Sequence, residues 1–145
     1  PIPRGNVTLE DLWNIVPVNP LVSTVTMTGN EILMMMEESI ESTFSCDPFG
    51  QMGGYLKRFR GMTFHVKLEN PPSRRVVGAF VGSDELVREQ SYLVSFITSQ
   101  GVPKKYGKSR KDLDIHAIDA LKNWFEKPQW ENAQIVPGSG RILIV

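Results

Sequence analysis

The sequence predicts one domain of mixed α/β (α+β) class, spanning residues 1–145. Two observations support this prediction. First, short apolar runs rich in β-branched residues recur along the chain between turn residues, a pattern typical of strands. Second, three segments have apolar residues at helical spacing after a capping residue. Strands with interspersed helices are typical of a sheet covered by helices rather than of a helical bundle. The length is enough to bury roughly two-thirds of the surface of the unfolded chain.

The first third of the chain predicts two helices and one strand. Thr8-Leu9-Glu10-Asp11 is an N-cap followed by an acid, which predicts a short helix over residues 9–15. Residues 21–27 alternate apolar and polar side chains and predict a strand. A second cap, Thr28-Gly29-Asn30-Glu31, opens a helix with one apolar stripe. The stripe consists of Ile32, Leu33, Met36, Ile40 and Phe44.

The remainder predicts further strands and a last helix. Residues 63–68, 76–81 and 92–97 are expected to be strands, and residues 99–111, which are polar and basic, an exposed loop. Asp112 or Asp114 is expected to cap the last helix. The apolar residues of that helix would lie on one face. They are Ile115, Ile118, Leu121, Trp124 and Phe125. A terminal strand follows at residues 142–145, short enough to need a partner in a sheet.

Composition excludes several classes of partner. Sixteen basic residues balance sixteen acidic ones, so no overall field attracts nucleic acid or a membrane surface. No apolar run approaches the ~20 residues that a membrane span needs. The chain opens at Pro1 without a methionine or a signal-peptide pattern, which favours an excised domain.

The sequence offers little of its own for catalysis. His65 and His116 have no second ligand at metal-binding spacing, so both are interpreted as structural or surface residues. Cys46 has no evident His partner and is expected to be a buried or inert thiol. Glu37, Glu38 and Glu41 are interpreted as a solvated helix face. We therefore expect no catalytic residue and no metal ligand within this chain.

Two basic clusters remain open to interpretation. Lys57, Arg58 and Arg60 lie between a glycine pair, Gly53 and Gly54, and Gly61. They are either a cationic edge for an anionic substrate, with Arg58 the better candidate, or an exposed strand edge protected by charge. The second cluster surrounds Tyr106 and is either a solvated loop or an anion or partner site. It consists of Lys104, Lys105, Lys108, Arg110 and Lys111.

Four segments in the same order resemble the C-terminal, substrate-binding domain of the 5′-nucleotidase family. They are residues 5–12, 15–17, 25–32 and 53–64, and the resemblance runs from about Pro1 to about Val102. The family consists of two-domain metallophosphoesterases and includes UDP-sugar hydrolases and a sulfur-oxidation thiosulfohydrolase.

The resemblance implies a substrate-recognition domain of a metal-dependent hydrolase that acts on nucleotides or related phosphoesters. It implies a metallophosphoesterase domain N-terminal to residue 1, which would hold a divalent metal pair. That domain would be the partner of this chain, and the two would close on a small anionic substrate. Alone, this chain would not be catalytically competent. The family also implies a periplasmic or cell-surface location.

The resemblance also implies positions for substrate contact. Family members that act on nucleotides clamp the base between two aromatic rings; Phe96 matches one ring position, whereas Val18 stands at the other. The acid that bonds the ribose hydroxyls in the family is replaced by Val102. Gly53 and Gly54 begin the loop that would line the site, and Arg58 would meet the anionic group.

Two alternatives stay open from the sequence. Gly101-Val102-Pro103 and the loop over residues 47–54 are similar to the thiosulfohydrolase branch, whose substrate is carried by a partner protein. The other alternative is a non-enzymatic module that binds a partner through residues 104–111.

Overall fold

The structure is a computed structural model that describes residues 5–53, 55–127 and 140–145. Its helices are α1 (Leu9–Ile15), α2 (Gly29–Phe44) and α3 (Ala117–Phe125). Its strands are β1 (Leu21–Thr28), β2 (Met62–Val66), β3 (Val76–Val81), β4 (Asp84–Glu85), β5 (Ser91–Phe96), β6 (Lys108–His116) and β7 (Arg141–Ile144). This arrangement confirms the predicted mixed α/β (α+β) class, although the strands divide between two sheets.

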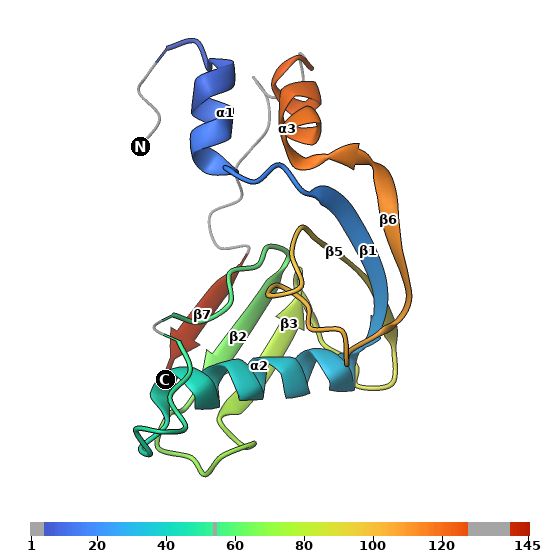
Figure 1. The fold of residues 1–145 in the computed structure, drawn as a ribbon. Helices are drawn as coiled ribbons and strands as arrows, with labels where there is room; N and C mark the ends of the chain where they lie inside the picture. The colour runs from blue at the N-terminus through green and yellow to red at the C-terminus, as the bar shows by residue number, and fades with distance from the viewer. Residues whose placement is uncertain (1–4, 54, 128–139) are drawn as a thin grey trace.

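The two sheets differ in their strand order and direction. The first has the order β5-β1-β6, with β1 antiparallel to both neighbours. The second has the order β4-β3-β2-β7, in which β7 runs parallel to β2. Helix α2 lies beside both sheets, whereas α1 and α3 stand together at the far end of β1 and β6 (Figure 1). The predicted terminal strand is confirmed as β7.

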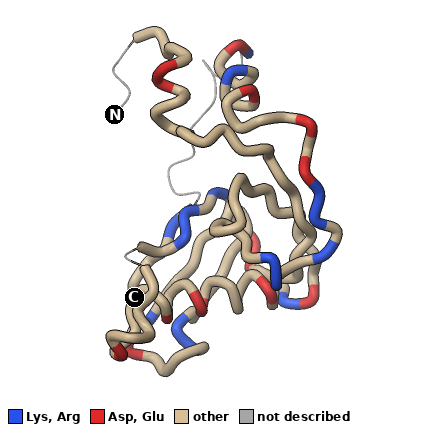
Figure 2. Tube along the Cα trace, viewed as in Figure 1, with Lys and Arg blue, Asp and Glu red and all other residues tan. Residues whose placement is uncertain are grey.

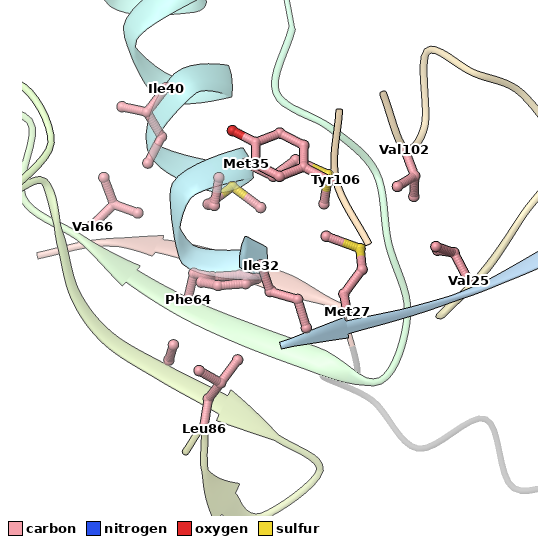
Figure 3. Packing of buried hydrophobic residues seen from close by; sticks show 12 residues of the cluster. Val25, Met27, Ile32, Met35, Ile40, Phe64, Val66, Leu86, Val102 and Tyr106 are labelled. Atoms are coloured by element: carbon pink, nitrogen blue, oxygen red, sulfur yellow. The ribbon is translucent and has the colours of Figure 1, made fainter. Parts of the chain in front are cut away.

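The core lies where α2 meets the two sheets. Side chains from β1, β2 and α2 point toward one another there (Figure 3). The largest fully buried side chains are those of Phe64, Met27, Ile32, Met36, Ile40, Val25 and Val66. Burying an aliphatic or aromatic side chain of this kind stabilises the fold by about 1.5–3 kcal/mol.

Both predicted capping boxes are present. The Thr8 hydroxyl accepts a hydrogen bond from the Asp11 amide at 3.2 Å, and the Asp11 carboxylate accepts one from the Thr8 amide at 2.8 Å. Thr28 and Glu31 exchange the same two bonds, at 3.2 and 2.8 Å. Each pair satisfies two amides that the first turn of a helix otherwise leaves without partners, and so fixes where α1 and α2 begin.

The structure corrects the prediction for residues 99–116. Residues 108–116 form β6, which pairs with β1, so Asp112 and Asp114 lie in a strand and do not cap a helix. Helix α3 begins only at Ala117, with His116 at its N-cap and Ile115 outside the helix. Val102 and Tyr106 are buried at 3% and 4% exposure, so the segment before β6 is not an exposed loop. Because the polar side chains of β6 face solvent, its sequence does not reveal that its backbone pairs.

Three further interpretations are wrong in whole or in part. Glu37 and Glu41 are partly buried: the Glu37 carboxylate accepts from the Val76 amide at 2.7 Å, and Glu41 pairs with buried Arg75 at 2.9 Å. Glu37 and Glu41 therefore hold the chain at the start of β3, whereas Glu38 is exposed. Cys46 was expected to be a buried or inert thiol, and the structure contradicts only the first alternative, because Cys46 is exposed. Residues 57–60 form no strand, so the protected strand edge proposed for them does not exist.

Stability at low pH is expected to depend on Glu31. Its carboxylate accepts bonds from the amides of Thr28 and Gly107, at 2.8 and 2.9 Å, and these bonds lower the pKa of Glu31 below its ordinary value of 4.5. Because the pKa of Glu31 is lower in the folded chain than in the unfolded chain, its ionised carboxylate stabilises the fold at any pH above the unfolded-state pKa. This contribution is lost as the pH falls through the folded-state pKa. Glu31→Gln should therefore lower the free energy of unfolding by about 1 kcal/mol at neutral pH. It should also make that free energy less dependent on pH below about pH 4.5.

Urea unfolding of wild type and Glu31→Gln between about pH 3 and pH 7 measures this effect. Glu10→Gln is the control, because Glu10 is an exposed acid in the first turn of α1. Parallel pH profiles for wild type and Glu31→Gln would contradict the assignment.

Candidate functional site

A cavity of about 770 Å³ lies between β5 and the segment that leads into β2. Its floor is apolar and comes from α2 and β2, through Ile32, Met36 and Phe64. One wall is β5, an edge strand of its sheet, and the other is residues 57–62. A cavity with apolar walls and a few polar groups is the usual setting of a small-molecule site.

Packing of two phenylalanine rings holds the 57–62 wall against the core. The Phe59 ring meets the buried Phe64 ring edge-to-face, with centroids 5.1 Å apart and an interplanar angle of 81°. Aromatic pairs in this geometry contribute about 0.5–1.5 kcal/mol beyond the area that they bury. The irregular segment is therefore anchored at Phe59, and its neighbouring charged residues are placed around the cavity.

Three cations line this wall. Lys57, Arg58 and Arg60 follow one another along the segment before β2 (Figure 2). The Lys57 ammonium donates a hydrogen bond to the Gln100 carbonyl. Burial lowers the pKa of Lys57, and the negative charge of nearby Glu38 opposes this effect. Arg58 is exposed and makes no side-chain hydrogen bond or ion pair to the residues that the structure describes. Its guanidinium is thus available for an anion, which it can bond through two N–H groups at once.

Phe96, the last residue of β5, carries a cation on one face of its ring. The Arg110 guanidinium lies 4.6 Å from the ring centroid, close enough for a cation–π interaction. The same guanidinium donates to the carbonyls of Val102, Pro103 and Tyr106, at 3.2, 3.0 and 3.4 Å. Arg110 thereby fixes the 102–106 segment against β5, and Phe96 itself lines the cavity.

Some of the predicted site residues come together and others do not. Phe96, Arg58 and Val102 line the same cavity. Gly53 lines a second cavity, of about 570 Å³, which Lys57 and Arg58 also line. Val18 lies in the turn between α1 and β1, is 81% exposed and lines neither cavity. Gly54 falls outside the described residues.

Sequence reasoning missed the role of Arg110, which it assigned to a basic loop. No local signal identifies Arg110, because its contact with Phe96 depends on the pairing of β6 with β1. Lys105, from the same cluster, pairs with Glu38 at 2.6 Å. Among the described residues, no three His, Cys, Asp or Glu side chains are grouped closely enough to hold a metal ion. Nor do the described residues include a helix long and apolar enough to cross a membrane.

Comparison with known proteins defines the class. The family model described as "5'-nucleotidase, C-terminal domain" matches residues 1–99. No curated protein matches the chain. The fold and the sequence therefore define a C-terminal domain of the nucleotidase type. The chain belongs to the 5′-nucleotidase C-terminal domain family.

Solved structures share the fold at low sequence identity. A Thermus thermophilus sulfate thiohydrolase, SoxB, has a TM-score of 0.70 at 18% identity over 99% of this chain. A 5′-nucleotidase precursor, also from Thermus thermophilus, has 0.68 at 20% identity over 99%. The NAD nucleotidase of Haemophilus influenzae has 0.65 at 14% identity over 97%. This chain spans 26%, 29% and 27% of those three chains, respectively.

Proposed function

We propose that this chain is the substrate-recognition domain of a metal-dependent hydrolase that acts on nucleotides or related phosphoesters. One observation carries the proposal: a single cavity brings together the half-buried ring of Phe96 and the cations Lys57, Arg58 and Arg60. A ring offers a stacking surface for a base, and the cations offer partners for a phosphate. These are the two chemically distinct parts of a nucleotide.

The hydrolytic step is assigned to another part of the full-length protein. The relatives of known structure are more than three times as long as the matching segment, and two of them carry nucleotidase in their names. We propose that a metallophosphoesterase domain with a divalent metal pair is the partner of this domain. The metals would supply the hydrolytic chemistry, and this chain would bind and orient the substrate. A location in the periplasm or at the cell surface is part of the same proposal.

Phe96 provides the direct test. A ligand at 100 times its dissociation constant raises the free energy of unfolding by about 2.7 kcal/mol. We expect AMP to stabilise the chain in this way, and Phe96→Ala to weaken AMP binding by about fivefold to a hundredfold, because stacking contributes about 1–3 kcal/mol per base. Thermal unfolding with increasing AMP measures both effects.

Two variants control this experiment. Phe96→Leu keeps an apolar side chain for Arg110 to cover but removes the aromatic face, so it should lose nearly as much affinity as Phe96→Ala. Phe49→Ala changes an almost fully exposed ring outside the cavity and should leave affinity unchanged. Equal AMP affinity in wild type and Phe96→Leu would remove the stacking role.

The thiosulfohydrolase-like alternative is tested by the same titration. The buried apolar side chain of Val102 offers no polar group to a ligand, and the fold matches that of SoxB as well as those of the nucleotidases. If neither AMP nor a UDP-sugar stabilises the chain, a non-nucleotide substrate presented by a carrier protein becomes the better proposal.

A further inference from the structure

The second sheet has an outer face that no helix of the described residues covers. Helix α2 packs on the core side, and α1 and α3 stand together at the far end of the other sheet (Figure 1). Side chains alternate between the two faces of a strand. Phe64 of β2 is fully buried, so Thr63 and His65 point outward. Ile142 of β7 packs against the core, so Arg141 also points outward.

Four residues form one row across this outer face. Phe80 of β3 pairs with Glu85 of β4 on one side and with Thr63 of β2 on the other. Thr63 in turn pairs with Arg141 of β7, and paired residues direct their side chains to the same face of a sheet. The row therefore has an acid at one edge and a base at the opposite edge, about 14 Å away by three strand spacings. Both charged residues are exposed, and neither forms an ion pair with the residues that the structure describes.

The centre of the outer face is aromatic and apolar. The rings of His65 and Phe80 have centroids 5.3 Å apart. Both rings lie over Gly78, where an added Cβ would be 3.4 Å from Cε2 of Phe80 and 3.5 Å from Nδ1 of His65. Leu143 of β7, which pairs with His65, is 40% exposed. An apolar centre with charged residues at the rim is the usual composition of a protein–protein interface.

The order of the charges along the row makes this face complementary to a second copy of itself. Two copies packed face to face are related by a two-fold axis in the plane between them. An axis parallel to the strands reverses the row, so each Glu85 lies opposite the Arg141 of the other copy, and Phe80 lies opposite Thr63. An axis across the strands would instead place each Glu85 opposite Glu85, which is repulsive. The charges therefore select both the partner and its orientation.

We propose that this chain forms a symmetric homodimer through the outer face of its second sheet, with two Glu85–Arg141 ion pairs between the copies. The cavity lies on the core side of the same sheet, where Phe64 and Met62 line it, so the dimer leaves the cavity of each copy open. Dimerisation through this face does not depend on the proposed function.

Sedimentation velocity over a series of concentrations measures the dissociation constant of the dimer. Wild type should dimerise in the micromolar range. Glu85→Arg and Arg141→Glu each place like charges opposite one another at both pairs, and each should weaken dimerisation by at least about tenfold. Both residues are exposed, so neither change should affect folding. Glu10→Arg is the control, because it changes the charge equally in α1, away from this face, and should leave the dissociation constant unchanged (Figure 1).

Two combinations of the variants restore the opposite charges. The double variant Glu85→Arg/Arg141→Glu has the net charge of wild type and should dimerise as wild type does. An equal mixture of the two single variants should form a heterodimer, because every arginine then lies opposite a glutamate. Wild type that stays monomeric up to millimolar concentration would overturn the proposal and assign this face to another part of the full-length protein. Dimerisation that the single variants leave unchanged, or that the double variant fails to restore, would also overturn it.

Discussion

Phe64→Ala is expected to lower the free energy of unfolding by about 3–5 kcal/mol, the usual cost of truncating a buried phenylalanine. Phe64 is fully buried in β2, the strand that pairs with both β3 and β7. Its ring fills space between α2 and the second sheet, and alanine would leave a void that the paired strands cannot close. Denaturant unfolding at neutral pH measures the change.

The same substitution should also weaken ligand binding. Phe64 supports the ring of Phe59, and Phe59 anchors the segment that carries Lys57, Arg58 and Arg60. Val77→Ala is the control, because Val77 on neighbouring β3 is 52% exposed and should cost no more than about 0.5 kcal/mol. A loss of less than about 1 kcal/mol in Phe64→Ala would contradict the packing described for this core.

Gly107→Ala is expected to destabilise the chain by about 2–4 kcal/mol. Gly107 precedes β6 with a φ of +76°, which alanine adopts only at a cost of about 1 kcal/mol. Its added Cβ would lie 2.4 Å from Cγ2 of buried Val25 and 2.9 Å from the Thr26 carbonyl oxygen. Overpacking of this kind costs a further 1–3 kcal/mol, roughly, because Val25 has no space into which to move.

Gly82→Ala separates the two contributions. Gly82 has a φ of +62°, but nothing lies within 4 Å of the position of its Cβ, so only the conformational cost of about 1 kcal/mol applies. The difference between the two variants in urea unfolding measures the steric contribution at Gly107. If both variants lose the same stability, the close approach of Gly107 to β1 is wrong.

Much of the fold follows from local sequence signals. The capping boxes at Thr8 and Thr28 mark where α1 and α2 begin, and the alternation along β1 identifies its buried face. These signals can be recognised in the sequence because a cap acts within one helical turn and the alternation acts within one strand. The family resemblance likewise assigns Phe96, Arg58 and Val102 to one site, and all three line one cavity. Val18 is placed elsewhere.

Tertiary structure alone decided the second half of the site. Strand β6 has mostly exposed, charged side chains and forms because β1 offers its backbone groups for pairing. Its register against β1 shifts near Ser109, a residue with a φ of +54°. That register brings Arg110 onto Phe96 and Asp112 onto Ser23. Elements with local signals, such as a cap or an alternating strand, can therefore be predicted from the sequence. The partners of Phe96 cannot, because a shift of one residue in strand register reverses which side chains share a face.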